Sequence, residues 1–270
     1  MIDPVYKAVE ESCITLRVDF TGAELAKLAT ENGMSMESIQ AVADVFAYLK
    51  VKKEEATIQM LLRTSRLPLK DIKTFQNFDF DVLRSKDIDK LKNLATLAPV
   101  YAHKNIIFIG PAGIGKTHLA QAFGYECCQQ GMKSYFIKAS ELRDKFVAAR
   151  KAGTESRVMT NMVRPSCLII DEIGRCEFGK EDTRMFFDLI DRRYTKEGTS
   201  NIVFTSNKNP SRWVECFHED DSLLCALDRI FDTSVVFNFR GESYRGKGCE
   251  SYAIQAGRTG SEAFTAPSIV

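Results

Sequence analysis

The fold is decided by the stretch Asn105-Ile-Ile-Phe-Ile-Gly110-Pro-Ala-Gly-Ile-Gly-Lys-Thr117. Its residues 106–109 are an apolar run typical of a buried strand, and its last eight residues fit the pattern G-x-x-x-x-G-K-[ST]. The glycines let the backbone curl so that successive N–H groups point at a phosphate, and the start of a following helix adds partial positive charge. A glycine turn without a ligand is the alternative. The strand before the loop and the helix expected after it favour phosphate binding.

Each residue of this loop is a candidate for holding ATP. The Lys116 ammonium supplies a point charge for the β and γ oxygens, and the Thr117 hydroxyl is placed to ligate Mg²⁺. ATP and Mg²⁺ are therefore the expected cofactors. The predicted nucleotide-binding residues of the loop are Gly110, Pro111, Ala112, Gly113, Ile114, Gly115, Lys116 and Thr117.

A second apolar run ends in two acids, in the order Cys167-Leu-Ile-Ile-Asp171-Glu172. A buried parallel strand would bring both acids to the carboxyl edge of the sheet, beside the phosphate loop. There Asp171 could hold Mg²⁺ through water, and Glu172 could polarise an attacking water molecule. Because many strands end in acids at a turn, this interpretation depends on the loop upstream.

From residue 105 onward, short β-rich runs alternate with helical stretches, which is typical of a parallel sheet covered on both faces. We expect strands over Asn105–Ile109, Ser134–Lys138, Cys167–Ile170, Asn201–Thr205 and Ser234–Phe239. We expect helices to begin near Thr117, Ser140, Glu181 and Leu223.

The N-terminal part is predicted to be helical, because apolar residues recur at helical spacing from Ala23 to Arg66, with Gly33 and Ser35 separating the first two helices. A connecting segment with Pro68 follows, and then a helix over Asp87–Leu97. The predicted division is an N-terminal helical domain for DNA or partner docking (1–68), a connecting segment and helix (69–100), an α/β ATPase domain (101–248), and a tail expected to be disordered (249–270).

Composition is that of a globular protein, with 44% hydrophobic and 27% charged residues. The net charge is only +1, so a nucleic-acid partner has to be argued from a local basic surface. No run of about 18 apolar residues occurs, and the N-terminus shows no basic region leading into an apolar one, so we expect a cytoplasmic protein without a membrane partner. The eight cysteines include no C-x-x-C pair, and we expect buried free thiols.

Taken in order, these motifs resemble those of the IstB-like ATPases, helper proteins of insertion-sequence transposition related to the helicase loader DnaC. The resemblance implies an α/β P-loop NTPase of the AAA+ type, with a five-stranded parallel sheet flanked by helices and a small all-α domain before it. It runs from Phe75 to Lys247 and rests on the segments Gly110–His118, Leu168–Gly174, Phe187–Tyr194, Thr205–Asn207, Ala226–Ile230 and Gly241–Arg245.

The resemblance adds His118 to the nucleotide-binding loop and implies a catalytic set that joins Glu172 to three further residues. Asn207 resembles a polar sensor of the γ-phosphate or the attacking water. Arg229 resembles an arginine finger that reaches the ATP of a neighbouring subunit, and Arg245 resembles a second sensor within its own subunit. A turn-forming Asn and two surface ion pairs are the alternatives.

The sequence departs from the resembled pattern after Gly174, where relatives have an apolar stretch of the Tyr-Leu-Pro-Leu type and this chain has Arg175-Cys-Glu-Phe178. Packing or partner contacts are expected to differ there. The 31 residues after Phe239 (240–270) are too few and too rich in glycine for the helical lid of many AAA+ proteins. A missing full lid is what the IstB and DnaC relatives show.

Two basic segments are candidates for contacting DNA. Residues 50–73 hold seven basic residues against three acids, and the helix expected over Glu141–Lys151 carries Arg143, Lys145, Arg150 and Lys151. Either segment could instead be a solvated helix face. A faint helix-turn-helix pattern over residues 25–39 has a turn that is too long, so a helical bundle that docks a partner is the better interpretation.

The resemblance implies an ATP-hydrolysing AAA+ ATPase that binds double-stranded DNA, assembles as a homo-oligomer with ATP sites shared between subunits, and recruits or stimulates a transposase. A DnaC-like loader with a replicative helicase as partner is the alternative. A small-molecule kinase is disfavoured because the pair Asp171-Glu172, Asn207 and the candidate arginine finger suit water attack and subunit coupling. A passive ATP-stabilised adaptor is a fourth possibility, under which Glu172→Gln would leave function intact.

Overall fold

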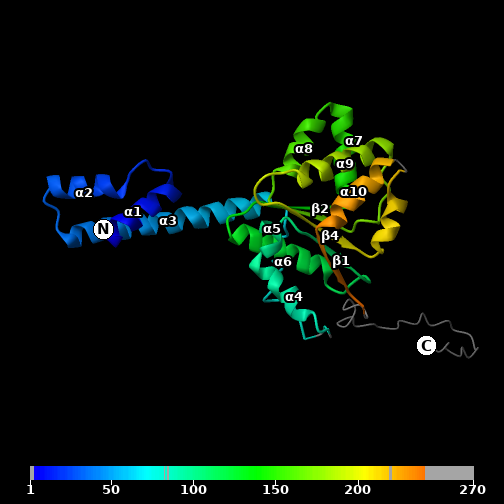
Figure 1. Ribbon diagram of the computed structural model, residues 1–270, viewed down its shortest axis with the longest axis horizontal. Helices are drawn as coiled ribbons and strands as arrows, with labels where there is room; N and C mark the ends of the chain where they lie inside the picture. The colour runs from blue at the N-terminus through cyan, green and yellow to red at the C-terminus, as the bar shows by residue number, and fades with distance from the viewer. Residues whose placement is uncertain (1–2, 82, 84, 219–220, 241–270) are drawn as a thin grey trace, which may run out of the picture.

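The computed structural model describes residues 3–81, 83, 85–218 and 221–240. Three helices form the N-terminal part: α1 (Pro4–Leu16), α2 (Gly22–Glu31) and α3 (Met36–Thr64). Figure 1 shows α1 and α2 lying along the first half of α3, while the second half runs on to the sheet. The three helices share a small apolar core of Val9, Cys13, Leu25, Ala29, Ile39 and Ala43.

Helix α1 lies before the first residue at which the apolar pattern predicted a helix. Its start is nevertheless encoded locally, because the Asp3 side chain accepts the Val5 N–H and Pro4 occupies the first turn. Helix α3 runs unbroken for 29 residues because neither glycine nor proline interrupts it. Within the described residues, no helix is long and apolar enough to cross a membrane.

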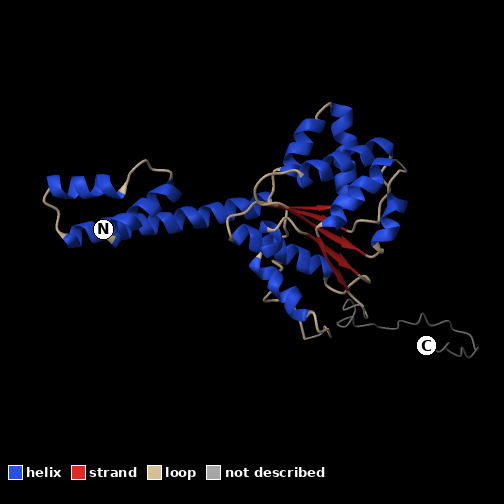
Figure 2. Ribbon diagram, in the orientation of Figure 1, coloured by secondary structure: helices blue, strands red, loops and turns tan. Residues whose placement is uncertain are grey.

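A parallel five-stranded sheet forms the centre of the second part, and Figure 2 shows it between two layers of helices. The strand order is β2-β3-β4-β1-β5, and every neighbouring pair is parallel. The five predicted strands are confirmed, each to within one residue at its carboxyl end. They are β1 (Asn105–Ile109), β2 (Ser134–Lys138), β3 (Cys167–Asp171), β4 (Asn201–Ser206) and β5 (Ser234–Asn238).

Alternating side chains of β1 divide the core into two halves. Ile107 and Ile109 face a core shared with α7, α8, α9 and α10, whereas Ile106 and Phe108 face a core shared with α6 and the connecting segment. This alternation explains why helices cover both faces. The helices are α6 (Lys116–Gln129), α7 (Ala139–Ala152), α8 (Glu155–Val163), α9 (Lys180–Tyr194) and α10 (Asp221–Asp232), with a 3₁₀ helix η2 (Pro210–Cys216) before α10.

Two short elements differ from the sequence prediction. The expected helix over Asp87–Leu97 is broken into α4 (Ile88–Lys92) and the 3₁₀ helix η1 (Asn93–Thr96), because Leu97 adopts a left-handed conformation before α5 (Ala98–Tyr101). Helix α8 was not predicted. It follows α7 after Gly153, whose left-handed conformation ends that helix.

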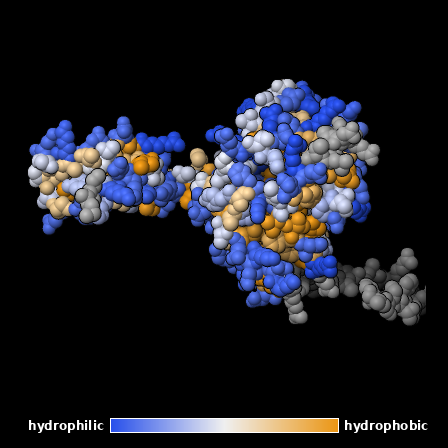
Figure 3. Space-filling model, in the orientation of Figure 1, coloured by the Kyte–Doolittle hydropathy of each residue, from blue (hydrophilic) through white to orange (hydrophobic). Residues whose placement is uncertain are grey.

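Among the described cysteines the thiols are free, and all but Cys176 are buried, as the sequence predicts. Cys225 and Cys249 lie outside the described side chains. At the edge of the sheet, β5 leaves Val236 47% exposed, and Figure 3 shows apolar residues on the viewed face between α10 and α4.

The second half of α3 is attached to the sheet domain by packing and by polar contacts. Leu61 and Leu62 pack against Cys128 of α6. The N–H of Phe136, on the edge strand β2, donates to the carbonyl oxygen of Ser65 at 2.7 Å. Arg66 continues the attachment through an ion pair with Glu141 of α7 at 2.7 Å. The end of α3 is thereby fixed to the sheet beside β2.

We predict that Leu62→Ala lowers the free energy of unfolding by about 2–4 kcal/mol, since it removes a buried side chain and leaves a cavity. Met60→Ala is the matched control, because Met60 lies on the same helix with 55% of its surface exposed. The control should change stability by less than about 0.5 kcal/mol. Urea unfolding followed by circular dichroism measures both, and equal losses would contradict the packing described for Leu62.

Candidate nucleotide-binding site

Three adjacent strands end at the same edge of the sheet, and each is followed by a predicted site segment. The glycine-rich loop follows β1, Asp171 ends β3 with Glu172 directly after it, and Asn207 follows β4, which lies between them. These segments surround a cavity of about 370 Å³. Its lining residues are Lys73, Ala112, Gly113, Gly115, Lys116, Thr117, His118, Gln121, Glu172, Arg175, Thr205 and Asn207.

Three predicted loop residues do not line this cavity. Ile114 is buried in the core on the α6 face of the sheet. Gly110 is pressed against Phe239, where an added Cβ would lie 2.6 Å from a carbonyl oxygen. Pro111 is exposed, and its carbonyl oxygen faces Lys116. These three residues therefore shape the loop rather than face the cavity.

Gly115 is the N-cap residue of α6, and this position requires the absence of a side chain for two reasons. Its φ of 95° lies in the left-handed region, and an added Cβ would lie 2.6 Å from the Phe78 ring. The close contact with Phe78 holds the connecting segment over the start of α6. A substitution here would disturb both the loop and that segment.

Lys116 is almost entirely buried at the first turn of α6, with 7% of its surface exposed. Its ammonium donates to the carbonyl oxygens of Gly110 and Pro111, each at 2.7 Å. A buried ammonium has to be compensated by such acceptors. The side chain is thereby folded across the loop, with its charge at the wall of the cavity.

Asp171 is the most buried carboxylate at this edge, with 2% of its surface exposed. One of its oxygens, Oδ1, accepts from the hydroxyl of Thr117 at 2.8 Å and from that of Thr205 at 2.6 Å. Burial raises the pKa of Asp171 above its ordinary value, although the two hydroxyl groups oppose the shift. Keeping this buried carboxylate ionised therefore costs free energy, and a nearby cation would reduce that cost.

Glu172 follows in a left-handed conformation, with a φ of 58°. Such a conformation costs about 1–3 kcal/mol in a residue other than glycine, and it persists where the surroundings impose it. Here the Glu172 N–H donates to Thr205 Oγ1 at 2.9 Å, and the side chain accepts from Arg175 Nη1 at 2.7 Å. The strained backbone turns the carboxylate toward the cavity.

Thr205 and Arg175 are site residues that the sequence interpretation missed. Thr205 was placed only within a strand and a motif, whereas its hydroxyl contacts both Asp171 and Glu172. Its register opposite Phe108 of β1 is the signal that places it at this edge. Arg175 was noted only as a departure from the resembled pattern, and it lines the cavity.

His118 links the loop helix to the connecting segment. Its Nε2 lies 2.9 Å from the carbonyl oxygen of Thr74, which can only accept, and its ring meets the Phe78 ring edge-on with centroids 5.1 Å apart. Burial lowers the pKa of His118, and the positive charge of Lys73 adds to that effect. The neutral imidazole is thus favoured, with the proton on Nε2.

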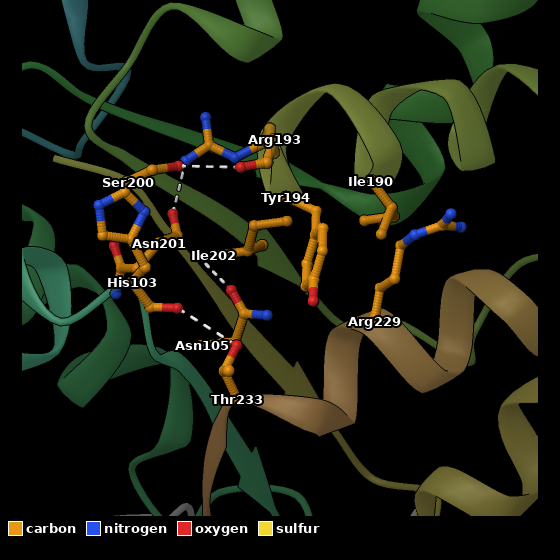
Figure 4. A pocket seen from close by; sticks show the side chains of 10 residues that line it. All are labelled: His103, Asn105, Ile190, Arg193, Tyr194, Ser200, Asn201, Ile202, Arg229 and Thr233. Atoms are coloured by element: carbon orange, nitrogen blue, oxygen red, sulfur yellow. Dashed lines mark hydrogen bonds between the residues drawn. The ribbon is translucent and has the colours of Figure 1, made fainter. Parts of the chain in front are cut away.

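Of the two predicted arginines, Arg229 does not line this cavity. Arg229 lies on α10, where it pairs with Asp191 of α9 at 3.2 Å and lies over the Tyr194 ring. It lines a different cavity of about 350 Å³, shown in Figure 4, together with Asn105 and Asn201 from the amino ends of β1 and β4. Arg245 lies outside the described residues.

The strand order, the loop at the end of β1 and the acids at the end of β3 define a P-loop ATP-binding protein of the AAA+ class. Its fold is similar to that of DnaI, with a TM-score of 0.53 and 17% identity over 67% of this chain and 95% of DnaI. AMPPCP-bound DnaA from Aquifex aeolicus matches with a TM-score of 0.52 and 21% identity, covering 63% of this chain and 51% of DnaA.

Within that class, the chain belongs to the family of IstB-like ATP-binding proteins, whose model matches residues 19–251. It is 37% identical over 195 residues to the ATP-binding protein of insertion sequence IS5376 from Geobacillus stearothermophilus. That match covers 72% of this chain and 76% of the relative. It is 34% identical to the ATP-binding protein of insertion sequence IS21 from Pseudomonas aeruginosa, with 72% and 71% covered.

We predict that lowering the pH reduces the stability of the folded protein through protonation of His118. Its pKa in the folded state lies below the ordinary value of 6.5, so the unfolded chain binds more protons as the pH falls from 6.5 through the folded-state pKa. Stability is therefore present above 6.5 and is lost through that window. In His118→Gln, whose amide can still donate to Thr74, melting temperatures should depend less on pH there. Parallel pH profiles for the two proteins would contradict this role of His118.

Proposed function

We propose that this protein is an ATP-hydrolysing, DNA-binding AAA+ ATPase that assembles on double-stranded DNA and recruits or stimulates a transposase. One observation carries the proposal: the phosphate loop, the acids Asp171 and Glu172, and Asn207 lie together at the carboxyl edge of the sheet. Arg229 lies at the opposite, amino edge. The sequence also supports the proposal, because the chain is 37% and 34% identical to two ATP-binding proteins of insertion sequences.

ATP hydrolysis requires Mg²⁺, and the oxygen ligands at the site suit that ion. The Thr117 hydroxyl and the Asp171 carboxylate supply such oxygens, and the two lie 2.8 Å apart. Among the described residues no three acidic, histidine or cysteine side chains gather as a metal site, so phosphate oxygens and water would complete the coordination. When bound, Mg²⁺ would neutralise charge on the phosphates, while Lys116 would bind their oxygens.

Glu172 is the proposed base, because its carboxylate lines the cavity beyond the phosphate loop. Asn207 is exposed at the end of β4 and lines the same cavity, which suits a sensor of the γ-phosphate or the attacking water. The proposal retains Arg245 as a second sensor on the strength of the family resemblance alone.

A shared active site is the proposed reason for assembly. Arg229 lines a cavity at the amino ends of the strands, whereas the phosphate loop lies at their carboxyl ends. An arginine finger on Arg229 would therefore serve a neighbouring subunit rather than its own. Asp191 and Tyr194 hold the guanidinium at the surface of α10 until such a neighbour is present.

Charge pairing favours the α3 segment over α7 as the DNA-contacting surface. On α7, Arg143 pairs with Asp144 and Arg150 with Asp182, which leaves two lysines. Within residues 50–73, four basic side chains have no ion-pair partner in the described part of the chain: Lys50, Lys53, Arg63 and Lys70. The proposed DNA-binding part is therefore the second half of α3 and the residues just after it.

A replicative helicase as client is the second candidate. Its support is the fold shared with DnaI and with the DnaC helicase loader, at 17% and 16% identity. The insertion-sequence proteins are about twice as similar in sequence, and they favour a transposase.

We expect duplex DNA and ATP together to raise the ATPase rate and to produce particles larger than the monomer in light scattering. A protein that stays monomeric, with an unchanged ATPase rate, would refute the assembly.

DNA affinity should fall steeply as the salt concentration rises, because binding to phosphates releases counterions. Changing Lys53, Arg63 and Lys70 to glutamine should reduce the slope of log affinity against log salt concentration by about 0.9 for each phosphate that these side chains neutralise. The double variant Lys145→Gln with Lys151→Gln is the matched control on α7.

Mixing two inactive variants tests the shared site. The Lys116→Ala variant lacks the ammonium that would bind phosphate but keeps Arg229. The Arg229→Ala variant keeps an intact phosphate loop but lacks the arginine. Hydrolysis should partly recover in the mixture, because some neighbouring pairs then combine an intact loop with an intact arginine. Neither variant should recover alone at the same concentration. No recovery, with both variants still binding DNA, would contradict action of Arg229 across subunits.

A further inference from the structure

An ion pair inside the nucleotide cavity joins Arg175 to Glu172, with Nη1 2.7 Å from Oε1. Both residues line the cavity that also contains Lys116 and Thr117 of the phosphate loop. The arginine therefore lies on the same cavity wall as the acid at the end of β3.

The turn that presents both side chains is packed against the end of β4. Between them, Ile173 is buried in the core, and its N–H donates to the carbonyl oxygen of Thr205 at 2.9 Å. Gly174 follows with a φ of 96°, and an added Cβ would contact Lys208 and Ser206 at 3.4 Å. Because the backbone before Arg175 is hydrogen-bonded and packed, we expect a change of partner at Arg175 to involve its side chain.

The pair itself can separate easily. The side chain of Arg175 is 57% exposed and that of Glu172 is 35% exposed, and exposed ion pairs gain little because water screens them. A terminal phosphate carries more charge than one carboxylate, and a guanidinium binds phosphate oxygens in a two-pronged geometry. A triphosphate in this cavity would therefore compete with Glu172 for the arginine.

The geometry points to Arg175 as a residue that binds the terminal phosphate of ATP and in doing so releases Glu172. Without a triphosphate, the guanidinium holds the carboxylate through Oε1 and keeps that oxygen from contacting a water molecule. With ATP bound, the guanidinium moves to the phosphate and the carboxylate becomes available. ADP lacks that phosphate, so the ion pair stays closed in the ADP state.

This inference rests on the proposed function for the role of Glu172, but the contact with phosphate requires only that ATP bind. Affinities for AMPPCP, which is not hydrolysed, and for ADP therefore test it without DNA or assembly. In Arg175→Leu, AMPPCP affinity should fall about tenfold, as expected for loss of a charge-assisted hydrogen bond, while ADP affinity changes less than about twofold. Equal losses for both nucleotides, or no loss for either, would overturn the inference.

A double-mutant cycle tests the exchange of partners. Glu172→Gln removes the competing carboxylate, so AMPPCP should bind more tightly to this variant than to the wild type. In the Glu172→Gln background, Arg175→Leu should cost more AMPPCP affinity than it does in the wild type. Equal losses in the two backgrounds would show that Glu172 does not compete for Arg175.

Arg212→Leu is the matched control, because Arg212 makes an ion pair with Glu215 at 2.8 Å with the same three-residue spacing, outside the cavity. It should leave both affinities unchanged. Lys116→Ala should lower the affinity for both AMPPCP and ADP. It therefore tests phosphate binding by the loop, and not the distinction between the two nucleotides. A failure of DNA-dependent assembly would leave all of these affinities as they are, so the two proposals fail separately.

Discussion

The buried carboxylate of Asp171 is the interaction on which the site depends. Its Oδ1 accepts from Thr117, at the start of α6, and from Thr205, near the end of β4. The same Thr205 hydroxyl accepts the N–H of Glu172 and so helps to hold that residue in its strained conformation. One hydroxyl therefore connects the acid proposed to ligate Mg²⁺, the proposed base and the central strand. The strand order β3-β4-β1 makes this possible, because it places β4 between the strand that carries the acids and the strand that leads into the loop.

Most of the fold follows from local sequence patterns. The strands could be predicted to within a residue because apolar runs end where polar chemistry begins, as at Asp171 and Ser206. Helix α1 was not predicted, because its capping residues, Asp3 and Pro4, lie before the apolar pattern on which the helix prediction was based. The break at Leu97 could not be read from periodicity, because its cause is the burial of that side chain in the core beneath the connecting segment. Tertiary packing therefore accounts for the conformation at Leu97, whereas local capping accounts for α1.

The site was predictable in its motifs and not in its contacts. The loop and the acids carry chemistry in their residue types, so the sequence predicts both as site residues. Thr205 and Arg175 carry no such mark: one is a strand residue of ordinary type, and the other is a charged residue in a turn. Their importance comes from the register that places Thr205 beside Asp171, and from a backbone turn that returns Arg175 to Glu172. Both depend on contacts that a single sequence does not display.

The connecting segment gives the nucleotide site a physical route to the N-terminal helices. Lys73 lines the cavity, the Thr74 carbonyl accepts from His118, and the Phe78 ring covers Gly115. Only a few residues earlier, Ser65 is bonded to the edge strand β2 at the end of α3. A triphosphate that displaces groups around Lys116 and His118 would therefore disturb the segment that begins where α3 is anchored. Since the basic residues proposed to contact DNA lie on that part of α3 and just after it, nucleotide state and DNA contact would be coupled through a short length of chain, without any change in the sheet.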